Sequence, residues 1–209
     1  MEQTNHFEIR DNFKYYDFEK TMTFLNKFGK SKFGEKFQIQ RSDSKILYQL
    51  MIYAIRDEEN CKKYKLDLDK GILLIGKVGC GKTSLMDIFR ILHYRNLHYN
   101  MYSSREIAKE FSVKGFETID KYGKMKRPIC LDDLGIEQNI KHFGSECNVM
   151  AEILLSRYDL MKYDGIITHA TTNLNADELE KIYGNRVRSR LREMFNVLHF
   201  PADAIDKRK

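Results

Sequence analysis

One stretch of the chain decides its fold class: Ile72-Leu73-Leu74-Ile75-Gly76-Lys77-Val78-Gly79-Cys80-Gly81-Lys82-Thr83. Four apolar residues, which are typical of a short buried strand, lead into a loop that matches the pattern G-x-x-x-x-G-K-[ST] at every fixed position. Beyond the loop, Leu85, Ile88, Phe89 and Leu92 recur at the spacing of one helix face. A strand, a glycine loop and a helix form the context that this pattern requires. We therefore interpret the loop as a phosphate-binding loop and not as a glycine-rich turn without a ligand.

The residues of this loop predict the cofactors ATP and Mg²⁺. Glycines let the loop turn its backbone N–H groups toward a triphosphate, and the following helix adds the positive end of its dipole. Lys82 is expected to reach the β- and γ-phosphates, and Thr83 is expected to hold Mg²⁺. The predicted nucleotide-binding residues are Gly76, Lys77, Val78, Gly79, Cys80, Gly81, Lys82, Thr83 and Ser84.

A second apolar run, Ile129-Cys130-Leu131, ends in two adjacent carboxylates 50 residues after Lys82. In an α/β protein the carboxyl end of such a strand lies beside the phosphate-binding loop. Asp132 is therefore predicted to hold Mg²⁺, and Asp133 to orient or deprotonate the attacking water. Alternatively, the two aspartates could simply cap a turn. The complete phosphate-binding loop favours their roles at the metal and the water.

Two later features are candidates for sensing the nucleotide. A predicted strand at Ile166–Ala170 is followed by Thr171-Thr172-Asn173, and the Asn173 amide could bond both the attacking water and the γ-phosphate. A turn-forming asparagine explains the spacing equally well. Arg186 and Arg190 are four residues apart and would share one helix face. One of them could point at the γ-phosphate of a neighbouring subunit, or both could form a solvated basic face.

Taken together, these motifs resemble the AAA+ ATPase domain of the DnaC/IstB group, the helicase loaders and transposition helpers. The resemblance covers residues 71–200 and rests on Gly76–Thr83, Leu131–Gly135, Thr171–Leu174 and Gly184–Leu191. It implies an α/β P-loop NTPase core with a five-stranded parallel sheet in the order 5-1-4-3-2 and no C-terminal lid domain. The alternation of strand and helix patterns supports the α/β class independently.

The resemblance also implies an activity and partners. It implies Mg²⁺-dependent ATP hydrolysis with Lys82, Asp133, Asn173 and either Arg190 or Arg186 in catalytic roles. The implied partners are single-stranded DNA, a replicative helicase and further copies of the chain in an ATP-dependent homo-oligomer. An IstB-like ATPase helper of a DNA transposase is the alternative. A nucleotide-binding scaffold that barely hydrolyses ATP is a third reading.

The remaining sequence predicts a short N-terminal addition to this core. We expect a helical, aromatic-rich segment at 1–65 and the ATPase core at 66–209. Nine aromatic residues lie between Phe7 and Phe37 among many lysines, and they could pack a small helix on the core or stack on single-stranded nucleic acid. A helical pattern then begins at Ser44 and is predicted to continue to about Glu59.

Composition and charge limit the remaining possibilities. A chain of 209 residues with 42% hydrophobic content can bury one sizeable core. The net charge is +6, and residues 181–209 alone hold eight basic and three acidic side chains, which suits either a nucleic-acid partner or a solvated tail. No uncharged apolar run approaches the roughly 18 residues of a membrane span, so we expect a cytoplasmic protein without a membrane partner. The four cysteines include no C-x-x-C pair and are expected to be free thiols.

Overall fold

A computed structural model of the chain describes residues 6–137, 140–142, 145–201 and 203–207. Its centre is a sheet of five parallel strands: β3 (Gly71–Ile75), β4 (Asn100–Ser103), β5 (Ile129–Leu134), β8 (Thr168–Thr172) and β9 (Phe195–His199). The strands lie side by side in the order β4-β5-β8-β3-β9. Numbered within this sheet alone and read from the β9 edge, this is the predicted order 5-1-4-3-2. The predicted α/β fold is therefore confirmed.

The sheet has an apolar core on each of its two faces. Successive side chains of a strand point to opposite faces. In β3, Ile72 and Leu74 accordingly pack in one apolar cluster, and Leu73 packs in the other. Leu74 is fully buried, which fits a strand that has a parallel neighbour on each side and helices on both faces.

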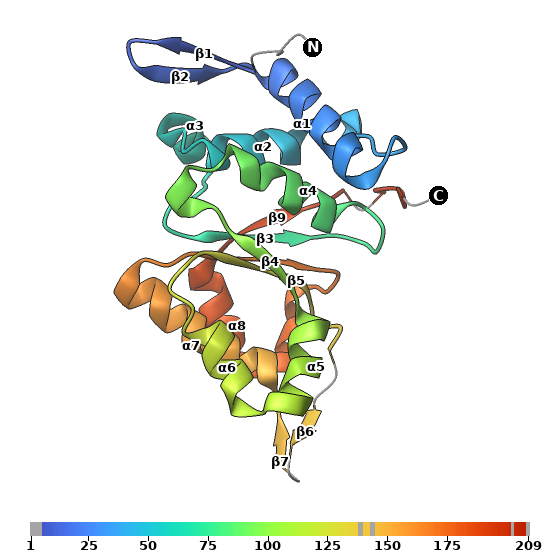
Figure 1. Ribbon diagram of the computed structural model, residues 1–209, viewed down its shortest axis with the longest axis vertical. Coiled ribbons are helices and arrows are strands. Elements are labelled where there is room, and N and C mark those ends of the chain that lie inside the picture. The colour runs from blue at the N-terminus through green and yellow to red at the C-terminus, as the bar shows by residue number, and fades with distance from the viewer. Residues whose placement is uncertain (1–5, 138–139, 143–144, 202, 208–209) are drawn as a thin grey trace.

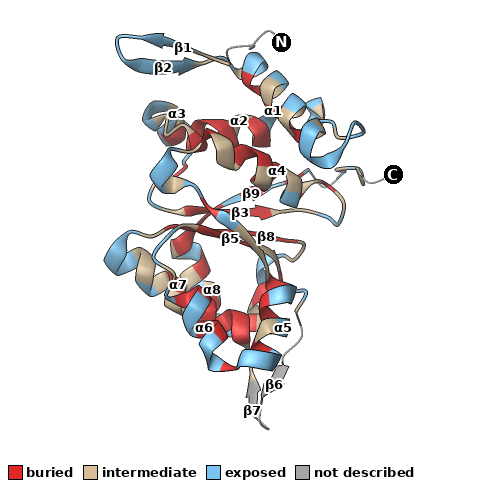
Figure 2. Cartoon of the chain, viewed as in Figure 1, coloured by how far each residue is buried: buried red, intermediate tan, exposed pale blue. Residues whose placement is uncertain are grey.

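Helices cover both faces of the sheet (Figure 1). One face carries α1 (Phe18–Phe33), α2 (Ser44–Ala54), α3 (Glu58–Lys63) and α4 (Lys82–Phe89). The other carries α5 (Ser104–Lys114), α6 (Phe116–Gly123), α7 (Val149–Asp164) and α8 (Ala176–Met194). Their buried residues gather on the sides that face the sheet or, in α1, on the side that faces α2 and α4 (Figure 2). Short 3₁₀ turns lie at Arg41–Asp43, Arg90–Leu92 and Arg95–Leu97. Within the described ranges no helix is long and apolar enough to cross a membrane.

Two antiparallel hairpins were not predicted. The first, β1 (Phe7–Arg10) with β2 (Phe13–Tyr16), projects at one end of the molecule (Figure 1). Its two-residue turn consists of Asp11 and Asn12, both with positive φ, which these residue types tolerate better than most. The second hairpin, β6 (Ile140–His142) with β7 (Ser145–Cys147), lies at the opposite end.

Several predicted element boundaries are corrected by the structure. The apolar spacing from Ser145 to Met161 predicts a helix, but this helix begins at Val149, because the Asn148 side chain accepts a hydrogen bond from the Ala151 N–H and caps it there. The helix predicted for Ser44 to Glu59 is broken after Ala54, since Arg56 adopts a positive φ and a new helix starts behind Asp57. The sequence also predicts a strand from Leu97 to Tyr102, but β4 begins at Asn100, and Leu97 lies in a 3₁₀ turn.

Asn175, followed three residues later by Glu178, predicts a helix start, and α8 opens there with a complete capping box. The Asn175 side chain accepts from the N–H groups of Asp177 and Glu178, and the Glu178 carboxylate accepts from the Asn175 N–H. Farther along the same helix, Gly184 has a φ of 85° and introduces a kink. The two predicted arginines, Arg186 and Arg190, therefore lie on the part of α8 that follows this kink.

Candidate nucleotide-binding site

The predicted phosphate-binding loop connects the carboxyl end of β3 to the first turn of α4. Gly79 and Gly81 have φ values of 81° and 101°, which glycine adopts without strain. At Gly76 the neighbouring side chains leave too little space for a larger residue, because an added Cβ would lie 2.8 Å from Cys80 Sγ and from Phe200 Cβ. Glycine at these positions allows the tight loop that a phosphate-binding site at the N-terminus of α4 requires.

Lys82 is 5% exposed and points back over the loop that precedes it. Its ammonium donates to the carbonyl oxygens of Gly76, at 2.9 Å, and Lys77, at 3.1 Å. It also donates to the Asn173 side-chain oxygen. The structure thus brings Lys82 and Asn173 together across the neighbouring strands β3 and β8, as the interpretation of Asn173 as a nucleotide sensor requires.

Thr83 and Asp132 meet at the sheet edge beside the loop. The Thr83 hydroxyl lies 2.9 Å and 3.0 Å from the two carboxylate oxygens of Asp132, and the Thr171 hydroxyl donates to Asp132 Oδ1 at 2.7 Å. Burial raises the pKa of Asp132, while the hydrogen bonds from Thr171 and Thr83 lower it. Hydroxyl and carboxylate oxygens are ligands that suit Mg²⁺.

The protein supplies only part of a metal coordination shell here. Over the described ranges, no group of three or more His, Cys, Asp and Glu side chains could hold a metal ion. Magnesium commonly binds one or two protein groups and takes its remaining ligands from phosphates and water. Thr83 and Asp132 therefore fit a Mg²⁺ that arrives with a nucleotide.

Asp133 lies beside Asp132 in an irregular part of β5. It has a φ of 57°, and its N–H donates to the Thr171 hydroxyl at 2.9 Å. The pairing of β5 with β8 shifts between Leu131 and Leu134, so that Asp132 and Asp133 form a bulge. Because a bulge redirects side chains, the two adjacent carboxylates need not point to opposite faces as in a regular strand.

The role of Thr171 was not predicted. Its one hydroxyl contacts both the Asp132 carboxylate and the Asp133 backbone, and so it holds the end of β5 in place. Its neighbour Thr172 donates to the Leu134 carbonyl oxygen at 2.7 Å and adds a second tie between the two strands. The only signal in the sequence was the position of both threonines directly before Asn173.

The structure does not bring Arg186 and Arg190 to this site. Arg186 is exposed, and it makes no polar contact with the rest of the described chain. The Arg190 guanidinium stacks on the Tyr158 ring, 4.3 Å from its centroid, and reaches the Tyr158 hydroxyl at 3.2 Å and Glu193 at 3.4 Å. If either arginine completes a nucleotide site, it does so in another copy of the chain.

A cavity of about 760 Å³ adjoins the loop and was not predicted. Its walls come from three parts of the chain: residues 36–40 with Phe33, the start of α4 at Ser84 and Leu85, and the C-terminal residues 205–207. The rings of Phe33 and Phe37 pack with centroids 5.4 Å apart. Asn26 fixes the segment by accepting from the Ile39 N–H at 2.8 Å. Part of the aromatic-rich N-terminal region therefore lines the space beside the phosphate-binding loop.

The C-terminal residues also touch the loop directly. The Lys207 N–H donates to the Gly79 carbonyl oxygen at 2.9 Å, and the Lys207 ammonium pairs with Asp43, which is 3% exposed. The Asp206 carboxylate packs against Gly79 so closely that a Cβ on this glycine would lie 2.1 Å from Asp206 Oδ1. An acidic side chain thus lies against the loop predicted to bind phosphates.

Comparison with solved structures relates this arrangement to proteins of DNA replication. The DnaC helicase loader matches with a TM-score of 0.55 at 18% identity, over 78% of this chain and 92% of that chain. DnaI matches with a TM-score of 0.51 at 25% identity, over 72% and 84%. The replication initiator DnaA, bound to AMPPCP and single-stranded DNA, matches with a TM-score of 0.53 at 19% identity, over 81% of this chain and 49% of that chain.

Sequence comparison finds no family profile that matches the chain and no curated protein that is similar to it. The likeness is therefore one of three-dimensional structure. It agrees with the strand order of the sheet and with the glycine loop between β3 and α4. The chain has the AAA+ fold of the DnaC-like helicase loaders.

Proposed function

We propose that the protein binds and hydrolyses ATP and acts as a helicase loader in DNA replication. The observation that carries this proposal is the meeting of four predicted residues at one sheet edge: Lys82 with Asn173, and Thr83 with Asp132. These contacts join three strands that are far apart in the sequence. They bring an ammonium group, a hydroxyl–carboxylate pair that suits Mg²⁺ and a polar amide to one loop, which supports a role in phosphoryl transfer.

Each of these residues has a separate task in hydrolysis. Lys82 holds the β- and γ-phosphates, and one or more of its present hydrogen-bond acceptors must then give way. Thr83 and Asp132 hold Mg²⁺, which neutralises charge on the phosphates when bound. Asp133 orients or deprotonates the attacking water, and the Asn173 amide hydrogen-bonds both that water and the γ-phosphate.

The cavity beside the loop supports a nucleotide as the ligand. Its volume of about 760 Å³ lies within the usual range of small-molecule sites, roughly 300–1,000 Å³. It combines apolar and aromatic walls with the amides of Gln38 and Gln40. We assign the nucleoside part of ATP to this cavity and its phosphates to the loop residues Gly76–Ser84.

Single-stranded DNA and a helicase are the proposed partners. Of the similar structures, DnaC is a helicase loader, and DnaA was solved with single-stranded DNA. We further propose an ATP-dependent homo-oligomer in which Arg186 or Arg190 reaches the γ-phosphate of a neighbouring copy. A protein with these partners acts where the chromosome is copied, so we propose a cytoplasmic location.

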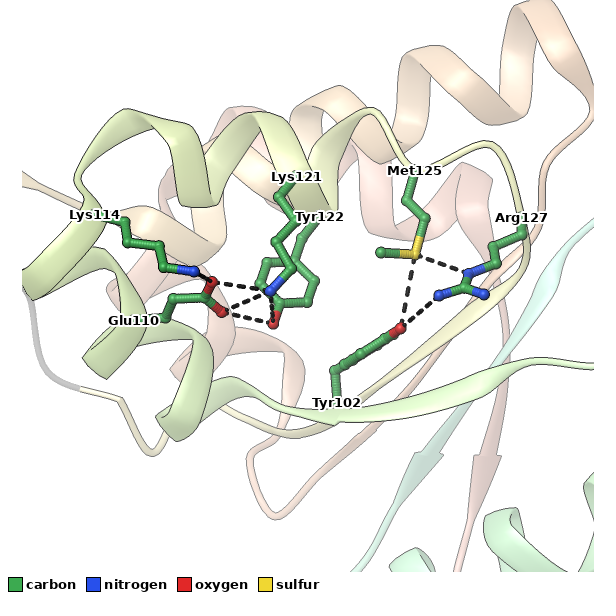
Figure 3. A network of polar contacts seen from close by, with 7 residues as sticks. All are labelled: Tyr102, Glu110, Lys114, Lys121, Tyr122, Met125 and Arg127. Carbon is green, nitrogen blue, oxygen red and sulfur yellow. Dashed lines mark hydrogen bonds and ion pairs between the residues drawn. The ribbon is translucent and has the colours of Figure 1, made fainter.

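We expect DNA phosphates to contact the lysines between β4 and β5, and all of these lysines carry ion pairs: Lys114, Lys121, Lys124 and Lys126. Glu110 binds both Lys114, at 3.0 Å, and Lys121, at 2.9 Å, and the hydrogen bond from Lys121 is the main cause that lowers the pKa of Glu110 to about 2 (Figure 3). Lys124 pairs with Asp120, and Lys126 lies 3.9 Å from Asp164. The last two pairs are exposed, and exposed pairs are worth roughly 0–1 kcal/mol each, so DNA phosphates can replace Asp120 and Asp164 at little cost. Glu110 is only partly exposed and holds its two lysines more firmly.

ATP binding by a Lys82→Ala variant tests the proposal. The change removes the cationic contact with the phosphates, so we expect weaker ATP binding and little or no hydrolysis, measured by titration with a fluorescent ATP analogue and by phosphate release. Lys63→Ala, an exposed lysine at the end of α3, is the control and should behave as wild type. Equal ATP binding by wild type and Lys82→Ala would show that the assigned site is wrong.

A further inference from the structure

The turn that follows Asp133 is closed by a carboxylate that the proposed mechanism does not use. Glu137 lies four residues after Asp133, and its Oε2 accepts from the Gly135 N–H at 3.0 Å. Its Oε1 accepts from the Tyr183 hydroxyl on α8. Burial raises the pKa of Glu137, whereas the bonds from Tyr183 and from the N–H groups of Glu137, Gly135 and Ile136 lower it. The carboxylate thus bonds the Gly135 N–H inside the turn and links the turn to α8 through Tyr183.

This turn needs support from outside its own backbone. Asp133 and Gly135 have φ values of 57° and 90°, so the chain passes twice through the left-handed region. The backbone hydrogen bond across the turn, from the Ile136 N–H to the Asp133 carbonyl oxygen, is 3.5 Å long and therefore weak. Glu137 supplies a shorter bond to the middle of the turn.

The same turn touches the predicted nucleotide sensor. An added Cβ at Gly135 would lie 2.2 Å from Leu174 Cδ1 and 3.4 Å from Ile182 Cδ1. Leu174 directly follows Asn173, which contacts Lys82. The residues that flank the proposed γ-phosphate position, Asp133 on β5 and Asn173 after β8, are therefore packed together through Gly135 and Leu174.

Tyr183 connects this packing to the second half of α8. It is 6% exposed, and it directly precedes Gly184, where a φ of 85° kinks the helix. The turn before the kink is also tied to α7, because the Asn148 amide donates to the Ile182 carbonyl oxygen at 2.7 Å. The bond between Tyr183 and Glu137 thus joins two irregular backbone segments, one carrying Asp133 and the other leading to Arg186.

We propose that Glu137 and Tyr183 are positioning residues for ATP hydrolysis, which hold the Asp133 turn in its working geometry against the kink of α8. Neither side chain is assigned a contact with the nucleotide. The inference rests on the proposed ATPase function and deepens it. It distinguishes the residues that bind ATP from Glu137 and Tyr183, which position Asp133, the group proposed to act on the attacking water.

Tyr183→Phe is the most direct test, because phenylalanine keeps the buried ring and removes only the hydroxyl. Small displacements of a catalytic group can lower a rate by on the order of 10²-fold. We expect kcat for ATP hydrolysis to fall about 10- to 100-fold, while the Kd for ATP stays within about twofold of wild type. Glu137→Gln should give the same pattern, since an amide presents only one oxygen to two donors.

Tyr53→Phe is the matched control. Tyr53 is also a buried tyrosine whose hydroxyl donates to a single acceptor, the Lys70 carbonyl oxygen at 2.7 Å, but it lies on α2 at the other face of the sheet. It should lower the melting temperature by an amount comparable to Tyr183→Phe and leave kcat unchanged. The control therefore separates loss of a buried hydrogen bond from loss of positioning.

A double mutant shows whether Tyr183 acts through Asp133. If it does, adding Tyr183→Phe to Asp133→Asn should cause no further loss of kcat, because the group being positioned is already disabled. A Tyr183→Phe protein with wild-type kcat and a lower melting temperature would overturn the inference and leave the proposed function intact. Losses of kcat that multiply in the double mutant would have the same consequence. A wild-type protein that hydrolyses no ATP would overturn the proposed function and the inference with it.

Discussion

At the scale of single residues, the structure gives the two adjacent aspartates different surroundings. Asp132 accepts hydrogen bonds from Thr83 and Thr171, whereas Asp133 is fixed through its backbone N–H and lies in a bulge. We therefore expect Asp133→Asn to bind ATP normally and to lose about 10²–10⁴-fold in hydrolysis rate, as is typical when a general base is removed. Asp132→Asn should instead raise the Mg²⁺ concentration needed for activity.

Measuring ATP binding and phosphate release over a Mg²⁺ series distinguishes these two roles. The asparagine in each variant keeps the size of the aspartate, so a difference between the variants reports the charge at each position. Equal Mg²⁺ dependence of both variants, or wild-type hydrolysis by Asp133→Asn, would contradict the division of tasks between the two carboxylates.

At the scale of elements, the C-terminal residues lie where phosphates are expected to bind. The Asp206 carboxylate packs against Gly79, and Lys207 is anchored by the buried Asp43. A triphosphate on the loop would meet the negative charge of Asp206, so binding requires this segment to move. Removing the carboxylate by Asp206→Ala should therefore tighten ATP binding about tenfold, the equivalent of 1.4 kcal/mol.

The chain offers a close control in Asp203→Ala, which removes the same charge from an exposed position in the same segment. Its Kd for ATP, measured in the same titration, should equal that of wild type. Lys207→Ala is less informative, because it would leave the buried Asp43 carboxylate without its cation and destabilise the fold. Weaker or unchanged ATP binding by Asp206→Ala would show that the segment does not oppose the nucleotide.

At the scale of the whole molecule, we expect two neighbouring histidines, the buried His169 and the half-buried His93, to make stability depend on pH. His169 is 2% exposed, and its Nδ1 accepts from the Ile72 N–H at 3.1 Å. Burial lowers its pKa and lowers that of the neighbouring His93 to about 3. A histidine in an unfolded chain has a pKa of about 6.5, so below this pH His169 and His93 take up protons in the unfolded state and not in the folded state. Their contribution to the free energy of unfolding is therefore fully present well above pH 6.5 and is lost as the pH falls through 6.5.

Between pH 7.5 and 5.5 we expect a loss of about 1.4 kcal/mol for each of the two histidines. Urea denaturation at the two pH values measures it. In His169→Gln the amide oxygen can still accept from the Ile72 N–H but the side chain cannot titrate, so the loss between the two pH values should be smaller than in wild type. An equal loss in both proteins would contradict the assignment to His169.

The sequence by itself determined the fold class and the residues of the phosphate-binding loop. These features depend on short-range patterns: apolar runs of strand length, a glycine loop with Lys82 and Thr83, and carboxylates directly after a strand. Parallel strands place their carboxyl ends at one edge of a sheet, so the approach of Asp132 to Thr83 follows from the order of these patterns along the chain.

Only the tertiary structure decided which distant segments meet at that edge. The pairs Lys207 with Asp43 and Tyr183 with Glu137 are separated by 164 and 46 residues, and no local pattern marks them. The hairpin at Phe7–Tyr16 and the break of α2 before Arg56 likewise depend on single residues with positive φ, which periodicity does not reveal. Such contacts form because the whole chain closes around two apolar cores. Their geometry therefore belongs to the fold and not to any one stretch of sequence.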